Sequence, residues 1–363
     1  MRPLILGAGA VGGYLGLELG LAGAAVAFVG RPETTAAISV HGLTLIDGQA
    51  QRRLPPAPVF DRLAPAVAEH HPDLILLTIK AYDLASTAAA LAAAPSAAPV
   101  VCFLNGIGAE AQLAQAIGHE RVIAATLTSA VERPSPATIV LTRRRGLGLQ
   151  GGSQAADKLA AACRQAGLRV SLFLDPQAMK WSKLLTNLMG GAIPSLTGLS
   201  VDEVYAHSGL YRLERAVLRE AIEVVDGLGL RLVDLPGAPI RALGLLMRLS
   251  PGLSQPLLRR VVAGGRGGKR PSLYWDVERG RTEIDWLNGA VAAAGIRLGL
   301  PTPANKLLTE AVHALTAAGG RQSQAGWLAE SLLAQASVAG VAGLSGYNRP
   351  GPGSPAISSH DSG

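Results

Sequence analysis

The sequence contains little cysteine, few aromatic residues and little charge. Two cysteines, Cys102 and Cys163, stand in a chain of 363 residues. They are too few for a disulfide framework, so we expect a reduced, cytoplasmic protein. Aromatic residues make up 4% of the chain, which leaves few rings for stacking on nucleic-acid bases. Charged residues make up 16% and hydrophobic residues 48%, a balance that excludes an intrinsically disordered chain.

The charge that is present is predominantly positive. Lysine and arginine number 33 against 26 aspartates and glutamates, which gives a net charge of +7. Such an excess is compatible with nucleic-acid binding, but the basic residues are mostly dispersed along the chain. We therefore interpret the excess as favouring small anionic ligands and expect no nucleic-acid partner.

The N-terminal stretch from Pro3 to Gly30 is long and apolar enough to resemble a membrane span. Glu18 is its only charged residue. Glycines interrupt it repeatedly and divide it into shorter elements, and no small-residue cleavage site follows a compact apolar core. We expect neither a membrane span nor a secretion signal.

The length corresponds to about two domains, and the first has an alternating pattern. Short apolar runs predict buried strands at 3–6, 25–29, 74–79 and 100–104. Helical patterns lie between them at 10–22, 83–93 and 108–117. This alternation predicts an α/β domain with a parallel sheet over residues 1–176. Further strand-like segments follow at 121–130, 137–141, 146–149 and 168–174.

Helical periodicity dominates after residue 176, and we expect an all-helical C-terminal domain over 177–340. Asp175 and Pro176 form a helix start, with the aspartate as N-cap and the proline in the first turn. Long helices are predicted at 177–189, 209–228, 284–298 and 304–318. The segment 230–271 reads as short helices in irregular chain, and the tail 345–363 as disordered.

A glycine-rich motif follows the first predicted strand and opens the first helix. Gly7, Ala8, Gly9, Ala10, Val11 and Gly12 form G-x-G-x-x-G in the context that makes it a Rossmann-type dinucleotide fingerprint. Gly7 permits the tight turn, Gly9 allows a pyrophosphate to approach, and Gly12 lets helix and strand pack closely. The alternative is a glycine-rich turn that binds nothing.

Three polar residues follow predicted strands. Arg31 stands where an NAD site usually has a carboxylate, and its guanidinium suits a 2′-phosphate, so NADP(H) is preferred. Lys80 follows 74–79 and Asn105 follows 100–104. The carboxyl ends of parallel strands line the ligand crevice, although either residue could equally be an ordinary loop residue.

The C-terminal half carries a second polar set. Lys183 and Asn187 share one helix face, and a buried lysine of lowered pKa is a usable general acid. A lysine that extends to solvent is the competing interpretation. Thr282 and Asp285 fit a capping box that places Glu283 near a helix start. The seven histidines show no recognised ligand spacing, so no metal site is predicted.

Five motifs in one order give the chain a family resemblance. They are Gly7–Gly12, Ile79–Ala81, Asn105–Gly108, Lys180–Asn187 and Thr282–Asp285. Over about residues 1–320 the chain resembles the ketopantoate reductase (2-dehydropantoate 2-reductase) family. The resemblance implies a Rossmann domain followed by a helical domain, with the active site in the cleft between them. It also implies NADPH-dependent reduction of 2-dehydropantoate to (R)-pantoate, a step towards pantothenate and coenzyme A.

The resemblance also implies roles for single residues. Lys183 matches the general acid that protonates the developing alkoxide, and Glu283 matches a glutamate that binds the substrate. The residues that match polar groups orienting substrate or cofactor are Asn105, Asn187 and Ser272. Lys80 matches a lysine near the cofactor, and Arg31 matches the residue that selects NADPH.

Two departures from the family pattern concern the substrate. The family often has an asparagine where this chain has Gly191, and the segment 230–271 is longer than in compact members, with a basic, glycine-rich stretch at 259–270. Two alternatives therefore remain: a reductase of another small 2-keto acid or keto compound, and an NADP-binding regulator without turnover. The apolar helical domain would support a homodimer.

Overall fold

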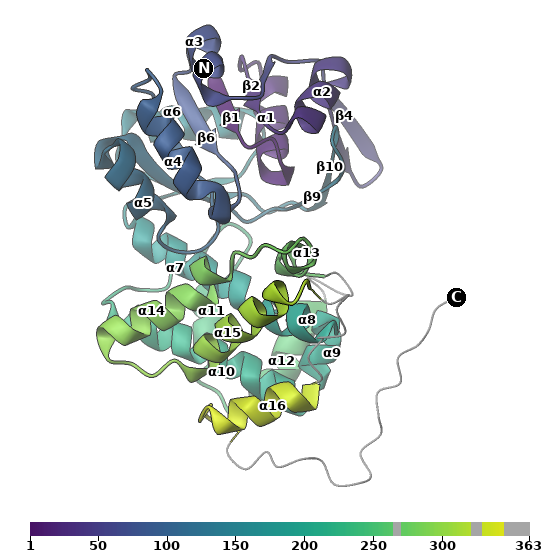
Figure 1. Ribbon diagram of the computed structural model, residues 1–363, viewed down its shortest axis with the longest axis vertical. Coiled ribbons are helices and arrows are strands. Elements are labelled where there is room, and N and C mark those ends of the chain that lie inside the picture. Colours follow the sequence, from purple (N-terminus) through teal and green to yellow (C-terminus); the bar gives the residue numbers. More distant parts are fainter. Residues whose placement is uncertain (264–269, 321–328, 345–363) are drawn as a thin grey trace. The chain divides into compact units, whose positions relative to one another are not determined.

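The computed structural model describes residues 1–263, 270–320 and 329–344, which group by their contacts into two compact units (Figure 1). The first unit comprises Met1–Leu188, Val225–Arg248 and Asp285–Ala290. The second comprises Met189–Val224, Leu249–Ile284 and the described residues from Val291 onward. The predicted disordered tail and residues 264–269 of the basic stretch lie outside the described residues.

An eight-stranded sheet forms the centre of the first unit, and its order is β12-β11-β8-β7-β6-β1-β2-β5. All of its neighbouring strands run parallel except β11 and β8, which are antiparallel. The parallel sheet predicted from the sequence is therefore confirmed. The strands are β1 (Pro3–Leu6), β2 (Ala27–Val29), β5 (Val59–Phe60), β6 (Leu74–Leu77), β7 (Val100–Cys102), β8 (Val122–Leu127), β11 (Leu147–Gln150) and β12 (Val170–Phe173).

Helices cover both faces of this sheet, and the two faces form separate apolar clusters. Ile5 of β1 packs with Tyr14 on one side, whereas Leu4 and Leu6 pack with Leu84 on the other. Successive strand residues point to opposite faces, so a fully buried strand is apolar throughout. The covering helices are α1 (Ala10–Leu21), α3 (Leu63–His70), α4 (Leu84–Ala93), α5 (Ala109–Ile117) and α6 (Gln154–Gln165).

A second sheet of four strands was not predicted, and its order is β4-β3-β10-β9. Its members are β3 (Leu43–Asp47), β4 (Ala50–Leu54), β9 (Ala130–Ser135) and β10 (Thr138–Arg143). The strand-like segment expected at 121–130 is confirmed as β8, which ends earlier than expected, and Ala130 already begins β9 of the small sheet. Helix α2 (Pro32–His41) lies between β2 and β3.

Helix α7 (Pro176–Leu188) begins as the sequence predicts. Asp175 Oδ1 accepts a hydrogen bond from the Ala178 N–H at 2.9 Å, which is the N-cap geometry. The helix packs on β8 and β11 and groups with the first unit. This grouping differs from the domain boundary expected near residue 176, and that boundary stays a prediction.

The described part of the second unit is helical (Figure 1). Its helices are α8 (Ala192–Thr197), α9 (Val201–Ala206), α12 (Pro251–Ala263), α13 (Ser272–Glu278), α15 (Pro303–Ala317) and α16 (Ala329–Val338). Helices α10 (Ser208–Gly227) and α14 (Asn288–Leu298) each run from one unit into the other, and α11 (Ile240–Leu246) belongs to the first.

The helix expected to begin at residue 284 begins later. Residues Ile284–Trp286 form a 3₁₀ turn, η3, and α14 starts only at Asn288. The Thr282 hydroxyl accepts from the Ile284 N–H at 3.1 Å. Because this bond closes a local turn two residues on, it favours an irregular start over a regular first helical turn.

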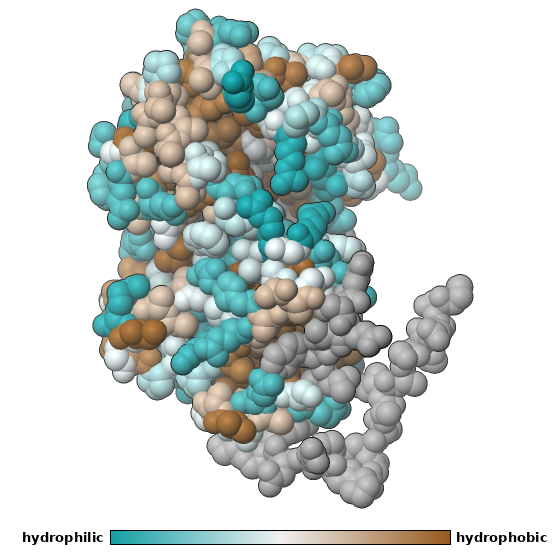
Figure 2. All heavy atoms as spheres, in the orientation of Figure 1, coloured by the Kyte–Doolittle hydropathy of each residue, from teal (hydrophilic) through white to brown (hydrophobic). Residues whose placement is uncertain are grey.

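No helix within the described residues combines the length and apolar character needed to cross a membrane. On the face shown in Figure 2, hydrophobic and hydrophilic residues are interspersed. The apolar N-terminal stretch is accounted for by β1, α1 and β2, which lie in the core of the first unit.

Candidate functional site

The glycine-rich turn joins β1 to α1 at the carboxyl edge of the large sheet. Gly7 has φ +110°, and a Cβ there would lie 2.8 Å from the backbone of Thr78 and Ile79. A Cβ on Gly12 would overlap the Gly7 carbonyl oxygen and the Thr78 hydroxyl. A Cβ on Gly9 would meet nothing within 4 Å. Gly7 and Gly12 are therefore required by the fold itself, whereas Gly9 faces open space.

The open position at Gly9 has the geometry of an anion site. Gly9 is the N-cap of α1, and Ala10 and Val11 form the first turn. The first N–H groups of a helix have no partner within it and carry the positive end of the helix dipole. A dinucleotide phosphate fits this place because no side chain blocks the approach.

Arg31 lies at the carboxyl end of β2, where it is the exposed N-cap residue of α2. A second arginine reaches the same helix start. Arg133 of β9 donates from Nη1 to the Thr34 hydroxyl at 3.0 Å, although the two residues are 99 positions apart. Two guanidinium groups therefore accompany the first turn of α2, of which the sequence indicated only Arg31.

Lys80 and Asn105 follow β6 and β7, which are the next strands along the same sheet edge. Both side chains are partly buried. Gly106 has φ +88°, and a Cβ there would overlap the Trp286 carbonyl oxygen, which also accepts from the Ile107 N–H at 2.9 Å. This close backbone contact fixes the chain immediately after Asn105. The structure thus brings the glycine turn, Arg31, Lys80 and Asn105 to one edge.

Asn187 joins α7 to that edge. Lys183 Nζ donates to Asn187 Oδ1 at 3.0 Å, and Asn187 Nδ2 donates to Asn105 Oδ1 at 3.3 Å. The Thr186 hydroxyl donates to the Lys183 carbonyl at 2.7 Å and accepts from Nζ at 3.2 Å. The partly buried ammonium group is therefore oriented by two neighbours on its own helix. Of the predicted residues, Lys183, Asn187 and Asn105 form one connected chain.

Lys180 belongs to the Lys180–Asn187 motif but was given no role from the sequence. It lies on the same helix as Lys183 and is more buried. Its side chain is 4% exposed, and its Nζ lies 2.7 Å from Glu110 Oε1. Burial lowers the pKa of Lys180, whereas the nearby Glu110 carboxylate and Cys102 raise it, and the net shift of the pKa is upward. The group is therefore charged at neutral pH. Sequence spacing does not separate it from Lys183, since both lie among the same apolar residues.

Ser272 and Glu283 belong to the second unit. Ser272 is the exposed first residue of α13, and Glu283 is 7% exposed immediately before η3. Nearby on the same unit, the Arg270 guanidinium lies 4.3 Å from the centre of the Tyr274 ring. The low exposure of Glu283 separates it from an ordinary surface carboxylate.

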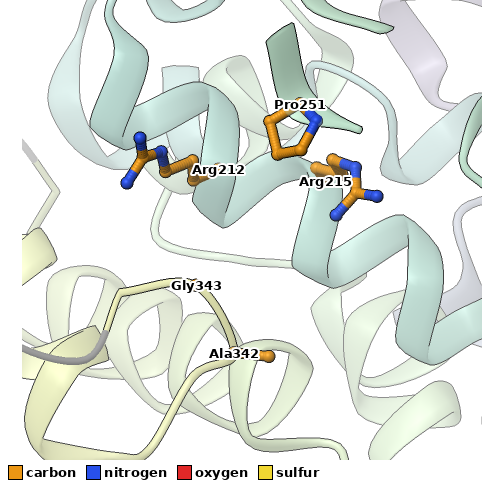
Figure 3. A pocket seen from close by; sticks show the side chains of 5 residues that line it. All are labelled: Arg212, Arg215, Pro251, Ala342 and Gly343. Atoms are coloured by element: carbon orange, nitrogen blue, oxygen red, sulfur yellow. The ribbon is translucent and has the colours of Figure 1, made fainter. Parts of the chain in front are cut away.

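A separate pocket of about 150 Å³ lies in the second unit (Figure 3). Its lining residues are Arg212, Arg215, Pro251, Ala342 and Gly343. Arg215 Nη2 donates to the Leu249 carbonyl at 2.7 Å, so this guanidinium helps to hold the chain before α12. None of the predicted site residues lines this pocket. Within the described part of the chain, no group of three or more His, Cys, Asp or Glu side chains is placed to hold a metal ion.

Comparison with known proteins identifies the family. The family model described as ketopantoate reductase PanE/ApbA matches residues 4–151, and the model of its C-terminal part matches residues 175–316. A 2-dehydropantoate 2-reductase of Mesorhizobium japonicum is 31% identical in an alignment of 333 residues, which covers 84% of this chain and 94% of the relative.

Solved structures show the same fold. A PanE/ApbA family ketopantoate reductase from Ralstonia eutropha superposes with a TM-score of 0.74 at 27% identity, over 89% of this chain and 100% of that one. A D-mandelate dehydrogenase solved with NADH and anilino(oxo)acetate gives a TM-score of 0.69 at 23% identity, over 88% and 99% of the two chains. On the two family models and the relative from Mesorhizobium japonicum, the chain belongs to the ketopantoate reductase family of oxidoreductases.

Proposed function

We propose that this protein reduces 2-dehydropantoate to (R)-pantoate with NADPH, in the synthesis of pantothenate and coenzyme A. The observation that carries the proposal is the Lys183–Asn187–Asn105 chain of hydrogen bonds. It reaches the sheet edge that also presents the glycine turn, where a dinucleotide fits. The proposed substrate is inferred from the name of the relatives, 2-dehydropantoate 2-reductase.

The first unit offers the residues that would hold the cofactor. Gly7 to Gly12 leave the start of α1 open to the pyrophosphate. Arg31, with Arg133 at the same end of α2, would pair with a 2′-phosphate. Lys80 lies at the neighbouring strand end. Since the D-mandelate dehydrogenase was solved with NADH, the preference for NADPH rests on these arginines rather than on the fold.

Lys183 would act as the general acid. When bound, NADPH supplies the hydride that adds to the keto carbon. Lys183 holds a proton at Nζ and donates it to the keto oxygen, while its charge stabilises the developing alkoxide. Asn187 Oδ1 fixes one N–H of the ammonium group and so orients the donor. Because Asn105 Oδ1 accepts from Asn187, the Nδ2 group of Asn105 is the donor end of the chain and suits a substrate oxygen.

The second unit would contribute substrate recognition. Glu283 is a carboxylate with little exposure, which suits it to accept a hydrogen bond from the substrate hydroxyl. Ser272 would supply a further hydroxyl from the start of α13. The proposal requires Glu283 and Lys183 to face the same nicotinamide edge. The proposal also includes that the protein acts in the cytoplasm as a homodimer.

A panel of 2-keto acids assayed by NADPH oxidation tests the proposal. We expect 2-dehydropantoate to give the highest kcat/KM. If another 2-keto acid or keto compound ranks far above it, the second candidate function is correct. That candidate is favoured by Gly191, a buried residue at the start of α8 that carries no amide. Tight NADPH binding without turnover of any substrate would instead identify a regulatory protein.

A further inference from the structure

Lys180 connects helix α7 to three separate elements of the first unit. Its Nζ donates to the Leu104 carbonyl at 2.5 Å and to the Ala125 carbonyl of β8 at 3.4 Å. It also forms the ion pair with Glu110 of α5 at 2.7 Å. The two carbonyl contacts are hydrogen bonds, and the contact with Glu110 is an ion pair. The side chain therefore joins α5, α7, β8 and the segment that follows β7.

Burying this charged group costs more free energy than burying an apolar side chain of the same size. Removing a charge from water costs several kcal/mol, and a buried ion pair often stabilises a fold no better than well-packed hydrophobic residues. The side chain of Glu110 is 18% exposed and that of Lys180 is 4% exposed. A gain in stability therefore explains poorly why a lysine stands at position 180. Its directional hydrogen bonds to two carbonyl oxygens instead fix a defined geometry.

The Leu104 carbonyl belongs to the peptide bond that leads into Asn105. A bond to that oxygen fixes the plane from which the Asn105 side chain starts. Asn105 Oδ1 in turn accepts from Asn187 Nδ2. Lys180 and Asn187 are about two helical turns apart and share one face of α7. The Asn105 segment is therefore attached to this helix twice, once through its backbone and once through its side chain.

We propose that Lys180 is a positioning residue of the reductase. Its bond to the Leu104 carbonyl places Asn105, and Asn105 places Asn187 and the Lys183 ammonium group. Glu110 holds Lys180 in this orientation. This inference rests on the proposed function of Lys183. The claim that Lys180 places Asn105 depends only on the fold of the first unit and can be tested without that function.

A purely structural role would have different consequences. A structural pair would change the free energy of unfolding and leave the turnover of the folded enzyme as it was. A positioning pair lowers kcat in the folded enzyme. It leaves the affinity for NADPH nearly unchanged, because the glycine turn that would bind the cofactor is not among the contacts of Lys180. Small displacements of a catalytic constellation cost as much as about 100-fold in rate.

The double variant Lys180→Met/Glu110→Gln tests the proposal, since it removes both charges and leaves neither group buried alone. The matched control is Lys306→Met/Glu310→Gln, an exposed pair at 3.9 Å in α15 whose side chains are 68% and 65% exposed. Thermal unfolding, NADPH affinity by fluorescence, kcat and amide hydrogen exchange over residues 103–108 are measured for both. We expect the double variant to lose about tenfold or more in kcat, with less than about threefold change in NADPH affinity and faster exchange at 103–108. The control should match the wild type.

Unchanged kcat and unchanged exchange in the folded double variant would overturn the proposal. If that variant does not fold, Lys180→Arg decides instead, because it keeps the charge but changes the donor geometry. Reduced kcat at wild-type thermal stability then supports positioning, and wild-type kcat overturns it. If the wild type turns over no keto acid, the proposed function fails. Hydrogen exchange at 103–108 then still decides whether Lys180 places the Asn105 segment.

Discussion

Asn187 Oδ1 accepts a hydrogen bond from Lys183 Nζ at 3.0 Å, one turn away on the same face of α7. The acceptor side of the amide is thereby directed to the lysine, and its donor side faces Asn105. An amide that bonds at both ends has one orientation, because reversing it would oppose two donors on one side and two acceptors on the other. Asn187 is the structural reason why Lys183 is the strongest candidate for the proton donor.

Lys183→Met removes the proposed acid and keeps the length of the side chain. General acid–base groups contribute about 100- to 10,000-fold, so we expect kcat for 2-dehydropantoate to fall within that range while NADPH affinity changes little. Steady-state kinetics and NADPH fluorescence measure the two effects. Lys158→Met, at an exposed position of α6, serves as the control. Turnover of the Lys183 variant at the wild-type rate would mean that another group donates the proton.

Arg31 and Arg133 are expected to select NADPH over NADH. Hydrogen bonds to charged groups contribute about 1.5–3 kcal/mol, so Arg31→Ala should raise KM for NADPH by roughly 10- to 100-fold and leave KM for NADH nearly unchanged. Arg133→Ala should have a smaller effect in the same direction. Arg62→Ala, at a residue that is 81% exposed, is the matched control. An equal loss with both cofactors would show that neither arginine contacts the 2′-phosphate.

The glycine turn allows a requirement of the fold to be separated from a requirement of the ligand. At Gly12 a Cβ would overlap the Gly7 carbonyl and the Thr78 hydroxyl, so Gly12→Ala should lower the free energy of unfolding by about 1–3 kcal/mol. At Gly9, where φ is −82° and a Cβ meets nothing within 4 Å, alanine should fold normally. NADPH affinity of Gly9→Ala should nevertheless fall by about tenfold or more, because the methyl group occupies the space of the pyrophosphate. Wild-type affinity in Gly9→Ala would place the pyrophosphate elsewhere.

The features that could be predicted from the sequence are those that depend on local chemistry. Strands β1, β6 and β7 are continuous apolar runs with both faces buried, and α7 has an aspartate cap and a proline start. The glycine motif combines a turn, a strand and a helix within a few residues. Each of these patterns lies within a short segment of sequence, so the sequence predicts the positions of these elements to within a few residues.

The features that could not be predicted depend on contacts between distant segments. Strand β4 carries mostly exposed polar residues and is held by its pairing with β3 and by the ion pair of Arg52 with the buried Glu18 of α1. Arg133 reaches α2 only because β9 pairs in the small sheet. Lys180 and Lys183 are equivalent in sequence pattern, and only tertiary packing shows which one faces the sheet.

Alkaline conditions should destabilise the protein through Tyr14. Burial, with the nearby Glu18 carboxylate, raises the pKa of Tyr14 from 10.0 to about 12. Above about pH 10 the unfolded chain loses this proton while the folded chain retains it, so stability falls as the pH rises from about 10 to about 12. The raised pKa of Lys180 acts in the same direction.

Denaturant unfolding at pH 8 and pH 11 measures this loss of stability. Tyr14→Phe should make the decrease between the two pH values smaller by about 1–2 kcal/mol. The same substitution at the partly exposed Tyr274 controls for loss of a hydroxyl group. An identical decrease in the wild type and Tyr14→Phe would assign the alkaline instability to other groups.

Gly191→Asn tests which keto acid the site prefers. Gly191 is the N-cap of α8 with φ −97° and ψ −82°, and because its φ is negative the position does not demand the left-handed backbone that favours glycine. The added amide supplies a donor and an acceptor where the family often has them. If 2-dehydropantoate is the substrate, its kcat/KM should rise by a few-fold relative to that of small 2-keto acids without a hydroxyl group, because one neutral hydrogen bond contributes about 0.5–1.5 kcal/mol. Thermal unfolding checks that the larger side chain is accommodated at this buried position. A fall in kcat/KM for 2-dehydropantoate in a stable variant would mean that the native substrate occupies the space beside Gly191, and would favour a different keto acid.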